Sequence, residues 1–204
     1  MILIGGSARS GTHMLGRVLE VGGFDVRFEE EPLFSMFTEY ALSGNRALFE
    51  ELSLQLRQSK DVVLKDHPSI WFPLHKTEAK MLVIRRNAPD TIASMMKHGG
   101  VLSWFAKWRE YPLPNRFLGI TRDLAPRYDD LPLEVKCFLR WQSHWERSED
   151  LRAQGVFIID FEEFEADAEK AALKVYSYLD VPMPPLSFHW KGRTLKVARS
   201  KFLE

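Results

Sequence analysis

Residues 5–12 have the composition of an anion-binding turn. The apolar run MILIG at residues 1–5 indicates a buried strand, and a helical pattern begins at Thr12. Small residues between them let backbone N–H groups surround an anion, and the positive end of the helix dipole adds to the attraction. Arg9 places a cation within the turn. A plain glycine turn with a surface arginine is the alternative, but the order of strand, turn and helix favours an anion site.

The glycine spacing of this turn matches an ATP-binding loop, but the neighbouring side chains do not. Gly6 and Gly11 have the spacing of G-x-x-x-x-G-K-S/T, whereas Thr12 replaces the lysine and His13 replaces the hydroxyl residue. In ATP-binding loops the lysine reaches the β- and γ-phosphates and the hydroxyl holds Mg²⁺. Their replacement weakens the case for a kinase or an ATPase.

A second strand–helix turn could hold another anion. Residues 80–85, KMLVIR, indicate a buried strand, and a helix is expected over 90–98. Arg86 at the strand end and Ser94 in the first helical turn could converge on one ligand. The alternative is an ordinary turn in which Asp90 caps the helix.

Two further segments offer groups that could remove a proton or stabilise charge. FEEEPLF places three carboxylates before a proline that starts a helix, and VVLKDHPSI places Lys65 and His67 after a buried strand. In a parallel sheet both strand ends lie at the same edge, so both segments could face the anion site. Glu29 and Glu30 are interpreted as a solvated turn.

These motifs resemble those of sulfotransferases that use 3′-phosphoadenosine 5′-phosphosulfate (PAPS) as the sulfo donor. SARSGTHML resembles their 5′-phosphosulfate loop, and RRNAPDTIAS has Arg, Asn, Asp and Ser at the spacing of their 3′-phosphate motif. PAPS has no γ-phosphate and needs no Mg²⁺, so the resemblance implies no metal. It also implies that Arg9 contacts the phosphosulfate and that the next four residues supply backbone N–H groups, with the Thr12 hydroxyl on the 5′-phosphate. The implied donor contacts are Arg9, Ser10, Gly11, Thr12 and His13 on the 5′ side, and Arg86 and Ser94 on the 3′ side.

The resemblance extends to the basic segment WKGRTLKVARSK near the C-terminus. Its Lys191, Gly192 and Arg193 are similar to the Arg-Lys-Gly segment that closes over the 3′-phosphate in cytosolic sulfotransferases. A solvated basic tail is the alternative.

The candidate catalytic residues resemble different branches of the family. EPL at residues 31–33 resembles a segment of carbohydrate sulfotransferases, and tyrosylprotein sulfotransferases have their base at the matching glutamate. KDH shares its lysine with both tyrosylprotein and cytosolic enzymes, and its histidine with the base of the cytosolic enzymes. The resemblance implies that Lys65 stabilises the sulfo group in flight and that Glu31 or His67 takes the acceptor's proton. We rank Glu31 first because a carboxylate can act as a base at neutral pH without tuning, whereas histidine must be neutral.

Composition excludes some classes of function. Of the 204 residues, 45% are apolar and 27% are charged, which is ordinary for a soluble globular protein. Lys plus Arg and Asp plus Glu both number 28, and the zero net charge argues against nucleic-acid and membrane-surface binders. Cys137 is the only cysteine, which excludes a disulfide framework and indicates a reducing compartment. A cytoplasmic location is expected, because the turn begins at residue 5 and no apolar run is long enough to span a membrane.

Alternating strand and helix patterns predict an α/β fold. We expect one domain over residues 1–204, a three-layer sandwich like that of P-loop NTPases, with a mostly parallel central sheet and helices on both faces. The expected strands are residues 1–5, 24–28, 61–65, 80–85 and 155–161. The expected helices are about residues 11–21, 32–42, 45–58, 90–98, 134–153 and 165–179. His144 lies on the fifth of these helices, where packing explains it better than chemistry.

Residues 99–133 differ in composition from the rest of the chain. They contain two adjacent glycines, four prolines and the aromatic residues Trp104, Phe105, Trp108 and Tyr111. This predicts a long excursion with short helical pieces, and we expect it to form the acceptor-side wall of the site. Ordinary helix packing is the alternative for the aromatic residues.

The resulting hypothesis is a sulfotransferase that moves the sulfo group of PAPS to a hydroxyl or amine by in-line attack and releases 3′-phosphoadenosine 5′-phosphate (PAP). The acceptor could be a small molecule, a glycan or a peptide, and neither the acceptor nor the oligomeric state can be read from the residues. Two alternatives stay open. One is a small-molecule kinase or nucleotide hydrolase with an altered loop, and the other is a PAPS-binding protein that has lost catalysis.

Overall fold

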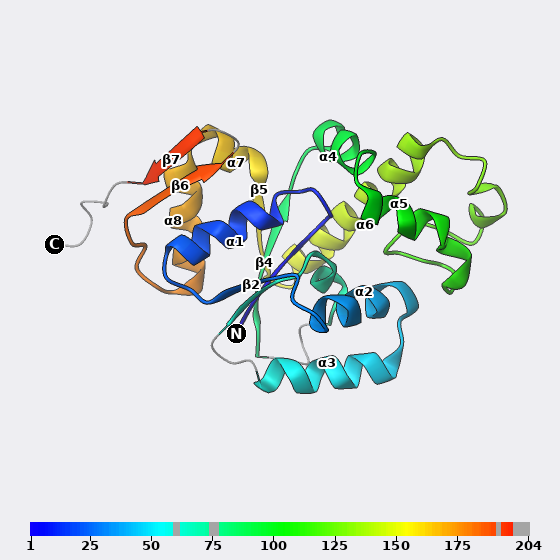
Figure 1. Cartoon of the computed structure of the whole chain (residues 1–204), viewed down its shortest axis with the longest axis horizontal. Coiled ribbons are helices and arrows are strands. Elements are labelled where there is room, and N and C mark those ends of the chain that lie inside the picture. Colours follow the sequence, from blue (N-terminus) through cyan, green and yellow to red (C-terminus); the bar gives the residue numbers. More distant parts are fainter. Residues whose placement is uncertain (59–61, 74–77, 191–192, 198–204) are drawn as a thin grey trace.

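Five parallel strands form the central sheet of the computed structural model, in the order β2–β3–β1–β4–β5 (Figure 1). The strands are Ile2–Gly6 (β1), Val26–Phe28 (β2), Val63–Lys65 (β3), Lys80–Arg85 (β4) and Phe157–Asp160 (β5). The described residues are 1–58, 62–73, 78–190 and 193–197. All ladders in this sheet are parallel, so the carboxyl ends of the strands share one edge.

Helices cover both faces of the sheet, because neighbouring strand residues point into two different apolar cores. Ile4 packs with α1 (Thr12–Val21) and α8 (Ala168–Leu179) on one face. Leu3 packs on the other face with α2 (Leu33–Ser43), α3 (Arg46–Gln58) and the end of α6 (Leu133–Ala153). Burial on both faces accounts for the continuous apolar runs in the strands. The predicted three-layer α/β fold is confirmed.

The excursion forms a third apolar cluster beside the sheet, at the right of Figure 1. Within the excursion lie α5 (Gly99–Ala106) and two 3₁₀ turns, η3 (Trp108–Glu110) and η4 (Ala125–Arg127). They pack with α4 (Ala88–Met95), which precedes the excursion, and with the first part of α6. The prediction of short helical pieces is therefore confirmed. One more 3₁₀ turn, η1 (His67–Trp71), follows β3.

Several element ends differ from the expected ones for local reasons. Helix α4 begins at Ala88 because Asn87 caps it, with Asp90 N–H donating to Asn87 Oδ1 at 3.0 Å. Asn87, not Asp90, is thus the cap. Strand β5 stops at Asp160, whose capping box with Glu163 starts α7 (Phe161–Ala166). The expected helix 165–179 is therefore split in two.

The chain beyond α8 forms a feature that its sequence pattern did not suggest. Strands β6 (Leu186–Trp190) and β7 (Arg193–Val197) pair antiparallel outside the central sheet, and β6 lies beside α1. Among the described helices, none has the length and apolar character to cross a membrane.

Candidate active site

The turn between β1 and α1 is held in shape by Ser10. Its hydroxyl lies 2.7 Å from the carbonyl oxygen of Ser7 and 2.9 Å from that of Ile84, and its N–H donates to Ser7 at 3.1 Å. These bonds hold the loop against β4. The donor contact expected for the Ser10 N–H stays a prediction.

Two glycines in this turn occupy positions that side chains cannot. Gly6 has φ +157°, and a Cβ there would lie 2.6 Å from the carbonyl oxygen of Ile84. Gly11 has φ +104°, and a Cβ there would lie 2.5 Å from the ring of Phe161. The motif spacing therefore reflects close packing of the turn against β4 and α7.

The first turn of α1 presents N–H groups that have no intrahelical acceptor. They belong to residues that follow Gly11 directly, with Thr12 buried and His13 exposed against the ring of Phe28. Arg9 sits just before them with φ +72°, a left-handed conformation that is uncommon outside glycine. The expected 5′-side groups, apart from Ser10, are thus available to a ligand.

The two predicted anion sites adjoin each other. Arg9 Nε donates to Ser94 Oγ at 2.9 Å, although 85 positions separate the two residues. Arg86 donates to Asp90 at 2.8 Å and its guanidinium lies 4.7 Å from the Phe161 ring centroid. Arg86 after β4 and Ser94 on α4 therefore lie next to the loop. Ser94 was expected in the first turn of its helix, but it lies in the last turn because α4 already begins at Ala88.

These groups line one cavity of about 500 Å³, which we call the loop cavity. Its loop side is formed by Arg9, Gly11, Thr12, His13, Arg86 and Ser94. Its lining also includes Phe34, His98, Gly100, Val101 and Trp104, together with Glu29, Lys65 and His67 at or just after the strand ends. Six of the residues expected to bind the donor and two of the three catalytic candidates thus line a single cavity.

Lys65 is buried at the end of β3 and forms an ion pair with Glu29. The pairing follows from the sheet, because Phe28 is opposite Lys65 in the β2–β3 ladder and Glu29 N–H donates to the Lys65 carbonyl at 3.0 Å. His67 Nδ1 lies 3.4 Å from the same Glu29 oxygen. One carboxylate therefore holds both the lysine and the histidine.

Burial and pairing set the charges of this cluster. Burial acts to raise the pKa of Glu29, but hydrogen bonds from His67 and Lys65 outweigh it and bring the pKa to about 2. Burial lowers the pKa of His67 to about 4, so the imidazole is neutral at pH 7. Burial also lowers the pKa of Lys65, and the Glu29 carboxylate opposes this. A neutral histidine thus lies beside a carboxylate, as in sites where a carboxylate orients a base.

Glu31 is not brought into the loop cavity. Its carboxylate accepts hydrogen bonds from the hydroxyl of Ser35 at 2.8 Å and from its N–H at 3.3 Å, in the first turn of α2. The carboxylate in the cavity is Glu29, which was interpreted as a solvated residue, and that interpretation is corrected here. Glu29 is the first carboxylate after β2, so the register of β2 with β3 was the signal that could have identified it.

Of the other residues named in the sequence analysis, some line the loop cavity and others do not. Trp104 lines the cavity and its ring lies 5.7 Å from that of His67. Trp108 is buried in the apolar cluster, where its Nε1–H donates to Asp129 at 2.7 Å. Arg193 begins β7, and the other two residues of the basic motif, Lys191 and Gly192, lie outside the described residues.

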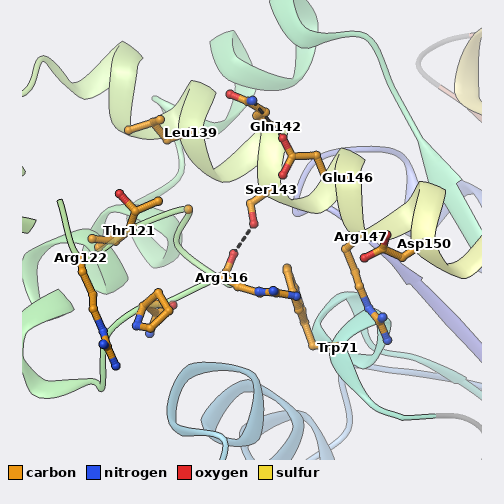
Figure 2. Close-up of a pocket in the computed structure, with 14 residues that line it drawn as sticks. Trp71, Arg116, Thr121, Arg122, Leu139, Gln142, Ser143, Glu146, Arg147 and Asp150 are labelled. Atoms are coloured by element: carbon orange, nitrogen blue, oxygen red, sulfur yellow. Dashed lines mark hydrogen bonds between the residues drawn. The ribbon is translucent and has the colours of Figure 1, made fainter. Parts of the chain in front are cut away.

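A second cavity of about 650 Å³ lies on the outer side of α6 (Figure 2). Ser143 donates there to the carbonyl oxygen of Arg116 at 2.6 Å, and the Trp71 side chain closes one side. None of the described residues predicted for donor binding or catalysis lines this larger cavity. Across the described part of the chain, no group of three or more His, Cys, Asp or Glu side chains is placed to hold a metal ion.

Comparison with known proteins identifies solved structures that share this fold. No curated protein sequence matches the chain significantly. Mouse sulfotransferase SULT7A1 complexed with PAP has a TM-score of 0.51 and 22% identity, and the match covers 90% of this chain and 60% of that one. A sulfotransferase from Alicyclobacillus acidocaldarius has a TM-score of 0.52 and 17% identity, covering 93% of this chain and 85% of the other. The sulfotransferase domain from the curacin biosynthetic pathway has a TM-score of 0.53 and 13% identity, and the match covers 99% of this chain and 84% of that one.

These structural likenesses show a shared fold, and the chain spans 60% of the length of the mouse enzyme. The sequence family adds a different kind of support, since the sulfotransferase domain matches residues 1–201, almost the whole chain. The chain therefore belongs to the sulfotransferase domain family.

Proposed function

We propose that this protein transfers the sulfo group of PAPS to a hydroxyl or amine acceptor in the loop cavity and releases PAP. The observation that carries the proposal is the convergence of an anion-binding turn with a buried Lys65 and a neutral His67 in one space. The mouse structure named above is a complex with PAP, which supports the same class of donor.

The two ends of the donor match two adjoining sets of groups. The 5′-phosphosulfate fits the start of α1, where free N–H groups, the helix dipole and Arg9 all favour an anion. The 3′-phosphate fits Arg86, which follows β4, and Ser94 in the last turn of α4. The hydrogen bond between Arg9 and Ser94 joins the two sets, so both ends of one nucleotide can be held together.

Side chains of the loop cavity can supply both the charge stabilisation and the proton acceptor for the reaction. The acceptor oxygen or nitrogen attacks sulfur while the bond from sulfur to the 5′-phosphate oxygen breaks, and that electron pair leaves with PAP. Lys65 stabilises negative charge on the sulfo oxygens and on the leaving oxygen. The acceptor's proton passes to a base beside the cavity.

We assign that base to His67 and reverse our ranking of Glu31. With Nδ1 directed at the Glu29 carboxylate, the buried Nε2 of His67 is left without a hydrogen-bond partner among the described residues, and we assign the acceptor's proton to this nitrogen. Glu29 fixes the tautomer and stabilises the imidazolium after proton transfer, which is the role of an orienting carboxylate. Glu29 itself is a weak base, because its pKa is about 2.

The experiment is a transfer screen with sulfur-labelled PAPS against separate pools of phenols, sugars, peptides and amines, with PAP formation measured in parallel. Transfer of label to one pool, lost in Lys65→Ala, is the expected result. Binding of PAP without transfer to any pool would identify a binding protein. Greater thermal stabilisation by ATP with Mg²⁺ than by PAP would identify a kinase or nucleotide hydrolase.

A further inference from the structure

Arg140, in the middle of α6, is a fully buried cation without a polar partner. Its side chain is 0% exposed, and none of its three guanidinium nitrogens has a hydrogen-bond partner among the described residues. The guanidinium carbon lies 4.5 Å from the ring centroid of Trp104 and 4.1 Å from that of Phe117. Aromatic faces attract a cation, but they satisfy none of its five N–H donors.

Arg85 is another buried arginine, but it has acidic partners. Its guanidinium also lies on a ring, 3.9 Å from the Trp145 centroid, but it forms ion pairs with Asp160 and Glu149. The titratable neighbours that favour the charged form of Arg140 are the phenol of Tyr128 and the thiol of Cys137, which are neutral at pH 7. A buried charge without a counter-ion is strongly disfavoured, so the two arginines stand in contrast.

The position of Arg140 relates it to the loop cavity. Trp104 contacts the guanidinium and also lines the cavity, where its ring lies 5.7 Å from that of His67. The charge of Arg140 is one of the influences that lower the pKa of His67, which agrees with their closeness. Arg140 therefore lies directly behind the wall that faces the proposed base.

We propose that Arg140 binds an anionic group carried by an aromatic acceptor, a carboxylate, phosphate or sulfate, which reaches the guanidinium when the Trp104 ring turns aside. That the bound molecule is the acceptor rests on the proposed function. That an anion binds here is inferred from the buried, unpaired guanidinium of Arg140 and its contact with Trp104. A planar guanidinium can form two parallel hydrogen bonds to such an anion. The rings of Trp104, Phe34 and Phe117 favour an aryl group between the anion and the reacting atom.

The test uses the full chain saturated with PAP, so that added anions cannot occupy the proposed 5′- and 3′-phosphate sites. Benzoate, phenylacetate and phenyl phosphate are titrated beside the neutral benzamide and phenylacetamide, with affinity measured by calorimetry. Inorganic phosphate alone is a further arm, which separates an aryl anion from a free ion. We expect the wild type to bind the aryl anions at least tenfold more tightly than the neutral compounds or inorganic phosphate.

The variants are Arg140→Met, Arg140→Lys and the matched control Arg85→Met. Arg140→Met should lose the preference for aryl anions while it keeps PAP affinity and a melting temperature equal to or above that of the wild type. Arg140→Lys should keep part of the preference. Arg85→Met should lower the melting temperature, because it strands two carboxylates.

Several results would overturn the proposal. Equal binding of benzoate and benzamide by the wild type would do so without any variant. So would an unchanged preference in Arg140→Met, or a fall in its melting temperature as large as that of Arg85→Met, which would make Arg140 a structural residue. Failure of the proposed function would be seen in other measurements. It would appear as absent PAP binding or absent sulfo transfer, whereas the anion site is judged from the difference between the wild type and the Arg140 variants.

Discussion

The two sides of the loop cavity are built in different ways. The proposed donor side comes from two continuous segments, β1 to α1 and β4 to α4. The proposed acceptor side takes Phe34 from α2, His67 from η1 and Trp104 from α5, with Arg140 of α6 behind them.

The difference suggests that donor binding can be changed separately from acceptor binding and turnover. On the proposed donor side, backbone N–H groups at the start of α1 attract an anion, and the hydrogen bond from Arg9 to Ser94 joins the two segments. The acceptor side exists only when four elements pack together, so its chemistry depends on side chains that meet across the structure. Changes on the donor side should therefore alter donor affinity, and changes on the acceptor side should alter turnover or acceptor affinity.

The largest effect should come from the proposed base. His67→Gln should lower kcat by about 10²–10⁴, the usual range for loss of a general base, with PAP binding intact. Glu31→Gln should change kcat by less than about threefold, because its carboxylate only caps α2. Single-turnover rates with labelled PAPS measure both. The opposite order of effects would return the role of base to Glu31 and contradict the geometry.

The next largest effect should come from the buried lysine. Lys65→Ala should lower kcat by about 10²–10³, as loss of one group that stabilises transition-state charge does. PAP affinity should change much less, because PAP lacks the sulfo group. Kinetics and PAP calorimetry on the same preparation separate the two. A loss of PAP binding as large as the loss of kcat would place Lys65 on the donor side of the comparison.

A change on the donor side should leave the acceptor side untouched. Arg86→Ala should weaken PAP binding at least tenfold, since a charged hydrogen bond contributes about 1.5–3 kcal/mol. Adenosine 5′-phosphosulfate, which lacks the 3′-phosphate, should bind nearly as before. Calorimetry with both ligands checks this, and equal losses for the two would refute the 3′-side assignment.

Two tryptophans from the excursion should behave differently. Trp104→Ala should raise the acceptor's KM severalfold and leave PAP affinity unchanged, because the ring lines the cavity. Trp108→Ala should instead destabilise the fold by about 3–5 kcal/mol, the usual cost of a buried aromatic truncation. Steady-state kinetics and chemical denaturation measure these effects. Loss of stability in both, without a change in KM, would show that the excursion is packing alone.

The smallest expected effect concerns pH. The unfolded chain binds a proton at His67 below about pH 6.5, whereas the folded protein does so only near its pKa of about 4. Stability from this group is therefore present above pH 6.5 and is lost as pH falls from about 6.5 to 4. Denaturation curves of the wild type and His67→Gln across this range should converge at low pH. The acidic limb of kcat/KM should likewise lie near pH 4, and a limb at 6.5 would mean that His67 is more exposed to water than the structure shows.

The sequence was sufficient for the fold and for the family. Alternating apolar strands and amphipathic helices predict a parallel sheet covered on both faces, because a buried strand and a half-buried helix have different periods. The glycines of the loop could also be read from their spacing, although the contacts that require Gly6 and Gly11 come from Ile84 of β4 and Phe161 of α7. The proposed donor contacts at Arg86 and Ser94 were likewise predicted from motif spacing.

The tertiary structure decided which carboxylate enters the site. FEEEP offers three glutamates in a row, and only the register of β2 with β3 selects Glu29, because Phe28 is opposite Lys65. It also decided that Trp104 faces the cavity while Trp108 is packed away from it. Arg140 gave no signal in the sequence, because its lack of a counter-ion is a property of the elements packed around it. Local patterns report backbone geometry, whereas the charge state and partners of a side chain depend on residues brought together by the whole fold.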